Sequence, residues 1–170
     1  MAIYLAPVNP ETDYPRIAEL MNTARKACVT LAQLREEGDN TRPGRIHLRI
    51  AAVDASGRML GYGDVGRDPG MPAGRFWFDV VVDCDARGRG VGSMLYDDIV
   101  QFAREQGATS LEIAIRDSAT TGLRFAARRG FTVERHDVPL IADGASARAA
   151  DRSRTDRDRS GVYTFVRELA

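Results

Sequence analysis

The segment Arg87-Gly88-Arg89-Gly90-Val91-Gly92 has the composition of a turn that binds phosphate. It follows the apolar, β-branched run 76–82 and precedes an amphipathic stretch over residues 91–106. A strand, a glycine-rich turn and a helix start together expose backbone N–H groups without intrahelical partners, and the helix dipole adds positive potential there. Glycine suits such a turn because a Cβ would hinder an approaching phosphate or would clash at positive φ. The spacing therefore predicts a site for a phosphorylated ligand.

Two other phosphate-binding turns fit these residues less well. A Walker A loop needs Gly-Lys-Ser/Thr at its end, whereas Gly92 is followed directly by Ser93 and no lysine is near. A dinucleotide-binding fingerprint needs a third glycine where Ser93 stands, and it belongs after the first strand of alternating β-α units. Here the turn lies in the middle of the chain. The first alternative fails and the second is disfavoured.

The bulk composition is that of one ordinary globular domain over residues 1–170. The 24 Lys and Arg residues balance the 24 Asp and Glu residues, which argues against a nucleic-acid-binding protein. Two cysteines and two histidines without ligand spacing predict neither a disulfide scaffold nor a metal site. No apolar run approaches the roughly 20 residues of a membrane helix, and no signal peptide is visible at the N-terminus. We expect a cytoplasmic protein that does not associate with membranes.

Hydrophobic periodicity and turn residues predict the element order β-α-α-β-β-β-α-β-α-β-β, which is typical of a mixed α+β domain. The first helix is expected to have Asp13 as its N-cap and Pro15 in its first turn. Thr30 and Gln33 resemble a capping box that begins the second helix, which ends by Gly38. The polar, charge-alternating residues 142–161 predict a mobile loop. The strands are expected at residues 3–8, 46–53, 59–65, 76–82, 111–115, 131–140 and 162–169, and the later helices at 91–106 and 119–129.

The spacing Arg87-x-x-Gly90-x-Gly92 resembles the pyrophosphate loop of the GNAT N-acetyltransferase superfamily, which usually reads Arg/Gln-x-x-Gly-x-Gly/Ala. A second match lies at residues 123–131, which resemble the family's late helix ending in Gly-Phe, here Gly130-Phe131. The element order is also the family's, so the resemblance covers nearly the whole chain. It is close to one domain of actinobacterial-looking members that carry two such domains. It implies a mostly antiparallel central sheet of about seven strands flanked by about four helices.

The resemblance implies an acetyl-CoA-dependent N-acetyltransferase that moves the acetyl group directly to a primary amine. A small-molecule amine is favoured over a protein amine, and a homodimer is a possible assembly. The alternative is a non-catalytic module that binds acyl-CoA. The resemblance implies that the pantetheine arm of the cofactor pairs with the backbone of the strand at 76–82 and that the pyrophosphate binds the glycine turn. Two later residues are implied to contact other parts of the cofactor. The matching residues are Val80 and Val82, then Arg87, Gly88, Arg89, Gly90, Val91, Gly92 and Ser93, and finally Asp117 and Phe125.

The chemistry of proton transfer is left open by the resemblance. Many family members have a tyrosine four residues before the Gly-Phe glycine to protonate the thiolate, and that position is Ala126 here. Asp79 is a candidate general base because burial in an apolar strand would raise its pKa, but a structural carboxylate is an equal alternative. Asp64 and Tyr62 are candidates for recognising the amine. The substitute proton donors are Ser118, Tyr96 and Tyr163, and the acceptor is expected to meet the loops at 28–44, 67–74 and 142–161.

Overall fold

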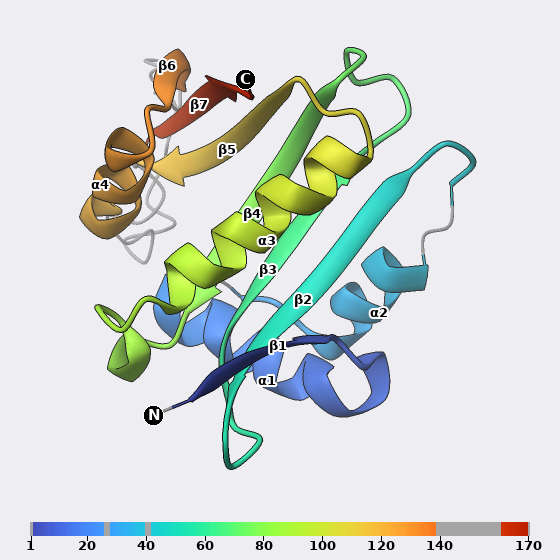
Figure 1. The fold of residues 1–170 in the computed structure, drawn as a ribbon, viewed down its shortest axis with the longest axis vertical. Helices are drawn as coiled ribbons and strands as arrows, with labels where there is room; N and C mark the ends of the chain where they lie inside the picture. Colours follow the sequence, from blue (N-terminus) through green and yellow to red (C-terminus); the bar gives the residue numbers. More distant parts are fainter. Residues whose placement is uncertain (1, 26–27, 40–41, 139–160, 170) are drawn as a thin grey trace, which may run out of the picture. The chain divides into compact units, whose positions relative to one another are not determined.

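The computed structural model describes residues 2–25, 28–39, 42–138 and 161–169 (Figure 1). Within these residues the chain forms four α-helices and seven strands in the predicted order. The strands form one mixed sheet in the order β1-β2-β3-β4-β5-β7-β6. The predicted α+β fold is therefore confirmed. The loop expected at 142–161 lies outside the described residues except for Gly161.

The chain divides into two compact units, Met1–Leu111 with Leu169–Ala170 and Glu112–Glu168. In the first unit the four strands pair antiparallel with their sequence neighbours. Helix α3 covers one face of β2, β3 and β4, and α1 and α2 cover the other face (Figure 1). The bounds are β1 (Ile3–Pro7), α1 (Pro10–Arg25), α2 (Leu31–Asp39), β2 (Ile46–Asp54), β3 (Met59–Arg67), β4 (Arg75–Val82) and α3 (Val91–Glu105).

Close contact between α3 and β3 depends on a glycine. A Cβ built on Gly63 would lie 2.9 Å from Cδ1 of Ile99, which is fully buried on α3. Because real Cβ atoms essentially never show such a separation, the bare Cα lets the helix settle onto the sheet. The N-terminus of α3 is thereby held beside the end of β4, where Val91 and Leu95 pack with Val80 and Val82.

Helix α1 begins earlier in the structure than the sequence predicts. The expectation that Asp13 caps α1 is wrong, because the helix begins at Pro10 and Pro15 lies inside it. Oδ1 of Asn9 instead accepts from the Glu11 N–H at 3.0 Å, and Oδ2 of Asp13 accepts from the Asn9 N–H at 2.8 Å. Proline at the first helical position lacks an N–H that would need a partner, which favours this earlier start.

The expected capping box at Thr30 is confirmed by two reciprocal bonds. The Thr30 N–H donates to Oε1 of Gln33 at 2.8 Å, and the Gln33 N–H donates to Oγ1 of Thr30 at 3.3 Å. Helix α2 continues one residue beyond Gly38, to Asp39. The helix start was therefore predicted more accurately than its end.

The second unit holds most of β5 (Ser110–Arg116), with α4 (Thr120–Arg128), β6 (Thr132–Asp137) and β7 (Val162–Glu168). Strand β6 pairs antiparallel with β7 and is shorter than the predicted 131–140, whose last two residues lie outside the described residues. Gly130 ends α4 as expected. Its N–H donates to the Ala127 carbonyl and the Phe131 N–H to the Ala126 carbonyl, both at 3.1 Å, which is the Schellman pattern.

Candidate functional site

The glycine turn lies between the end of β4 and the first turn of α3. A short 3-10 helix that the sequence did not predict, η1 (Cys84–Ala86), leads into it. Gly88 and Gly90 have φ values of +75° and +83°, a region that other L-residues rarely adopt. Gly90 is the N-cap of α3 and has no side chain that could accept from the first helical N–H groups, of which that of Ser93 donates to the Gly90 carbonyl at 3.0 Å.

The space in front of this turn is open. A Cβ built on Gly88 or Gly90 would meet nothing within 4 Å. Both glycines are therefore required by backbone conformation rather than by crowding, and an oxyanion could approach their backbone. A helix of 15 residues adds the positive end of its dipole at the same place. The turn thus has the shape and polarity of a phosphate cradle.

The side chains around the turn divide into exposed and buried groups. Arg87, Arg89 and Ser93 are exposed, and Gly92 is half-buried. Val91 is 1% exposed and packs in the core beneath α3, so only its backbone is available to a ligand. The turn therefore exposes two guanidinium groups and a hydroxyl, while the buried Val91 side chain fixes it to the core.

Asp83 joins this turn to the rest of the first unit. Its Oδ1 accepts from the Asp85 N–H at 3.1 Å and so caps η1. Its Oδ2 accepts from Nη2 of Arg58 at 2.8 Å and from Nη2 of Arg16. Burial opposes ionisation of Asp83, but the Asp85 N–H and the two arginines outweigh it, so the pKa of this carboxyl lies below its ordinary value.

Three polar residues lie in one row across the middle strands. Arg49 of β2 is opposite Asp64 of β3, which is opposite Asp79 of β4. Because Asp64 and Asp79 are two residues from Tyr62 and Val81 on their strands, they share the sheet face that α1 and α2 cover. Asp79 is half-buried. The predicted base therefore faces the side of the sheet that carries the N-terminal helices.

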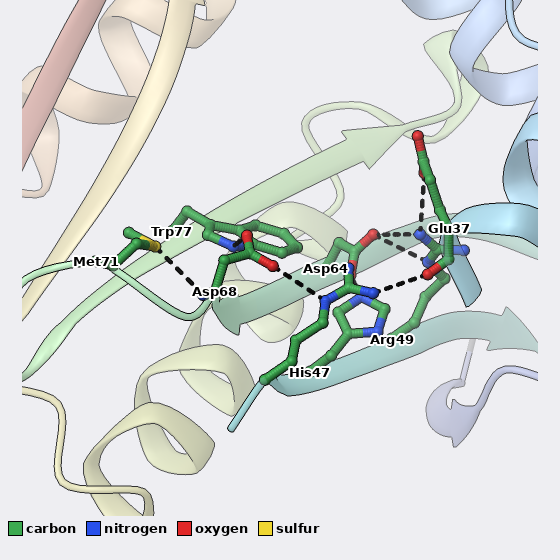
Figure 2. A network of polar contacts seen from close by, with 8 residues as sticks. Glu37, His47, Arg49, Asp64, Asp68, Met71 and Trp77 are labelled. Atoms are coloured by element: carbon green, nitrogen blue, oxygen red, sulfur yellow. Dashed lines mark hydrogen bonds and ion pairs between the residues drawn. The ribbon is translucent and has the colours of Figure 1, made fainter. Parts of the chain in front are cut away.

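Asp64 contacts both Arg49 and His47 (Figure 2). Its Oδ2 accepts from Nε and Nη2 of Arg49 at 2.9 and 2.6 Å, and its Oδ1 contacts Nε2 of His47. Burial lowers the pKa of Arg49, but the charge and hydrogen bonds of Asp64 outweigh it and raise that pKa above its ordinary value. The ring of Tyr14 lies 5.4 Å from the guanidinium carbon. These contacts leave Asp64 little capacity to receive an amine, and Tyr62 is only 2% exposed.

The same network connects two loops that were expected to meet the acceptor. Nη1 of Arg45 donates to the Glu37 carbonyl at 2.8 Å, and its Nε lies 3.2 Å from Oδ1 of Asp68. Nε1 of Trp77 donates to Oδ2 of Asp68 at 2.9 Å, and the Asp68 N–H contacts Sδ of Met71 at 3.4 Å. Figure 2 shows the Asp68 side chain next to the Trp77 ring. The end of α2 and the loop after β3 are therefore held together by side chains that sequence reasoning did not single out.

The remaining predicted residues lie in the second unit. Oδ2 of Asp117 accepts from the Gly161 N–H at 2.8 Å and lies 4.0 Å from Nε2 of His136. Phe125 is half-buried beneath the guanidinium of Arg129, at 3.9 Å. Asp117 and Phe125 thus have structural partners within this unit, whatever else they bind.

The candidate proton donors have different surroundings. Ser118 is exposed, whereas Ala126 is fully buried and carries no ionisable group. Tyr96, on α3 of the first unit, is 3% exposed and lies 5.5 Å from the Phe78 ring. Tyr163 of the second unit stacks on His136 at 3.9 Å between ring centroids. Of these hydroxyls, Ser118 has the greatest access to solvent.

Residues 2–25, 28–39, 42–138 and 161–169 contain neither a membrane-spanning helix nor a cluster of metal-ligand side chains. No helix there is long and apolar enough to cross a membrane. No group of three or more His, Cys, Asp or Glu side chains in those ranges could hold a metal ion.

Solved structures share the fold over nearly the full length of the chain. A GCN5-related N-acetyltransferase from Kribbella flavida aligns with a TM-score of 0.74 and 22% identity, covering 99% of this chain and 98% of that one. Ard1 from Thermoplasma volcanium aligns with 0.78 and 19%, covering 100% and 99%. A ribosomal-protein-alanine N-acetyltransferase from Brucella melitensis aligns with 0.72 and 16%, covering 98% and 99%. At these identities the likeness shows the fold alone.

The sequence itself identifies the family. No curated protein is significantly similar to the chain. The model of the acetyltransferase (GNAT) family, however, matches residues 14–131, a span that begins in α1 and includes the glycine turn and the Gly130-Phe131 ending. Since this span is more than half of the 170 residues, the chain belongs to the GNAT family of acetyltransferases.

Proposed function

We propose that this protein transfers the acetyl group of acetyl-CoA directly to a primary amine, with a small-molecule amine favoured over a protein. The observation that carries the proposal is the open glycine turn at the start of α3, where Gly88 and Gly90 leave room for phosphate at the backbone. Family membership supports acetyl-CoA as the donor.

In the proposed donor site, the pyrophosphate binds the backbone of residues 87–93 and the exposed guanidinium groups of Arg87 and Arg89 screen its charge. The pantetheine arm pairs with the backbone of β4 at Val80 and Val82, in the manner of an added strand. Asp117 and Phe125 are proposed contacts for other parts of the cofactor.

In the proposed reaction, the amine nitrogen attacks the thioester carbonyl carbon while the carbonyl oxygen accepts a hydrogen bond from the Val80 N–H. The C–S bond then breaks and the thiolate of CoA leaves. Asp79 takes the proton that the amine loses, and Ser118 is the proposed donor to the thiolate. A thiol with a pKa near 8.5 is a tolerable leaving group, so the donor assists the reaction without being required.

Thermal stabilisation by CoA tests the donor site. A ligand that binds only the native state adds roughly 2.7 kcal/mol at 100 times its dissociation constant. Millimolar CoA should therefore raise the melting temperature of the wild type, and Gly90→Glu should abolish the shift because its side chain adds bulk and negative charge in the cradle. NAD and ATP serve as comparison ligands, and a larger shift with either would contradict the proposal.

Thiol release from acetyl-CoA over a panel of amines tests catalysis. The panel includes peptides with an N-terminal alanine, because one structural neighbour is named for acetylating such a terminus. Asp79→Asn should reduce turnover and remove the acidic limb of its pH profile, because a general base acts only when deprotonated, whereas Asp97→Asn, an exposed change on α3, should do neither. An Asp79→Asn variant with an unchanged profile would exclude Asp79 as the base.

A second candidate function is binding of acyl-CoA without catalysis. Ala126 favours it, because that position lacks the tyrosine of many relatives. This function predicts CoA binding without thiol release on any amine in the panel. A homodimer and a cytoplasmic location stay predictions.

A further inference from the structure

We propose that Asp83 is a positioning residue for the donor, which holds the phosphate-binding turn in place by tying it to α1. The inference rests on the proposed function, since it takes the turn as the site of the CoA pyrophosphate. Asp83 immediately follows β4. In this role its carboxylate acts on the turn and does not itself contact the ligand.

The carboxylate of Asp83 joins three separate segments. One oxygen caps η1 through the Asp85 N–H, and the other accepts from Arg16 of α1 and from Arg58 of the β2–β3 turn. Arg16 also donates from Nη2 to the Met59 carbonyl at 3.3 Å. The side chains of Arg16 and Asp83 are 25% and 13% exposed, so water screens their ion pair less than the pair with Arg58, whose side chain is 54% exposed.

Apolar packing does not replace these ties. A cavity of about 200 Å³ lies between α1 and the residues that follow β4. Its lining includes Leu20, Thr23 and Ala24 on the helix, and Cys84 and Asp85 on η1. Val81 of β4 packs with α1, whereas this cavity separates the helix from η1, so the Arg16–Asp83 ion pair bridges the two segments there.

A purely electrostatic effect and a positioning role predict opposite changes in CoA affinity when the Asp83 carboxylate is removed. A negative charge four residues before the start of the turn at Arg87 repels a pyrophosphate, so its removal would tighten binding if electrostatics alone mattered. A positioning role predicts the reverse, because the untied turn must be ordered when the ligand binds. Asp83→Asn separates the two effects, since its amide oxygen can still cap η1 while the ion pairs with Arg16 and Arg58 are lost.

The experiment compares CoA affinity by calorimetry in the wild type, Asp83→Asn, Arg16→Met and Asp85→Asn. Asp85→Asn is the matched control, because it removes one nearby negative charge without removing a tie to α1. We expect Asp83→Asn and Arg16→Met to weaken CoA binding about tenfold, the effect of losing one charged hydrogen bond. Asp85→Asn should bind CoA as tightly as the wild type or more tightly.

Turnover distinguishes positioning from general destabilisation. With an amine substrate, the KM for acetyl-CoA should rise in Asp83→Asn while kcat at saturation stays within twofold, whereas partial unfolding would lower kcat. If Asp83→Asn does not fold, Asp83→Ser takes its place, because its hydroxyl oxygen can cap η1 and charge and position again predict opposite effects on CoA binding. Unchanged or tighter CoA binding by the folded variants overturns the inference. Absence of CoA binding by the wild type instead refutes the proposed function, and the inference with it.

Discussion

Replacing Gly90 by alanine tests whether the backbone of the glycine turn binds the donor, and Gly107 supplies a matched control. These glycines flank α3 at its start and its end, with φ values of +83° and +81°. A Cβ built on either meets nothing within 4 Å. An L-residue in this conformation costs roughly 1–2 kcal/mol, so both variants should lose similar stability. For a chain of this size, each kcal/mol lowers Tm by about 2–4 °C.

Only the methyl group at Gly90 occupies the space in front of the first N–H groups of α3. If it prevents one charge-assisted hydrogen bond to a phosphate oxygen, the loss is about 1.5–3 kcal/mol. This corresponds to a roughly 10- to 150-fold higher Kd for CoA. Gly107→Ala should bind CoA as the wild type does, because its methyl group lies at the far end of the helix.

Calorimetric titration with CoA and thermal melting without ligand measure the two effects separately. Equal CoA affinity of Gly90→Ala and Gly107→Ala would show that the turn does not hold the pyrophosphate. A difference of many degrees between their melting temperatures would show that the strain in the two glycines is not equivalent.

Three further predictions concern stability. Gly38→Ala should destabilise the fold by about 1–3 kcal/mol in denaturant titration, because a Cβ there would overlap the hydroxyl of Tyr14, which is 4% exposed. Arg49→Met should cost about 3–5 kcal/mol in the same assay, since it leaves the buried Asp64 carboxylate without its strongest partner. Burial raises the pKa of Asp98, so its ionised form is disfavoured in the folded state and native stability falls as pH rises through that pKa. Asp98→Asn should therefore melt above the wild type at pH 7, and the difference should vanish in melts below about pH 4.

The parts of the fold that depend on local signals could be predicted from the sequence. The order of strands and helices follows from periodicity and turn residues, and the Thr30 capping box and the Gly130 helix end follow from local hydrogen bonding. The glycine turn was also found where expected, because the positive φ of Gly88 and Gly90 leaves few alternatives to glycine.

The contacts between distant residues could not be predicted in the same way. Arg16 and Asp83 are 67 residues apart, and their pairing depends on how α1 lies on the sheet. For Arg49 and Asp64 the difficulty is a register shift between Ala52 and Val53. Counting outward from the Val53–Met59 pair would place Arg49 opposite Gly63, one residue from its true partner. A single bulge thus hid the network around Asp64.

The same lack of local signal applies to the candidate site. Asp79 and the glycine turn could be selected by residue type and spacing. Their roles as general base and pyrophosphate site stay proposals. Asp83 drew no attention because an aspartate after a strand is common in turns and its two arginines come from other elements. A helix-capping pattern between Asp83 and Asp85 was the one local signal that could have found it.

The contact between Gly63 and Ile99 restricts the order in which this protein can change during evolution. Alanine at residue 63 meets Cδ1 of the isoleucine at 2.9 Å, while the next atoms, Cγ2 of Ile50 and Cγ1 of Ile99, lie at an ordinary 3.5 Å. Ile99→Val removes only Cδ1 and typically costs 0.5–1.5 kcal/mol. Gly63→Ala is therefore accessible to a lineage that has already shortened Ile99, and is selected against in one that has not. The two positions should vary together among descendants of this sequence, with the change on the helix coming first.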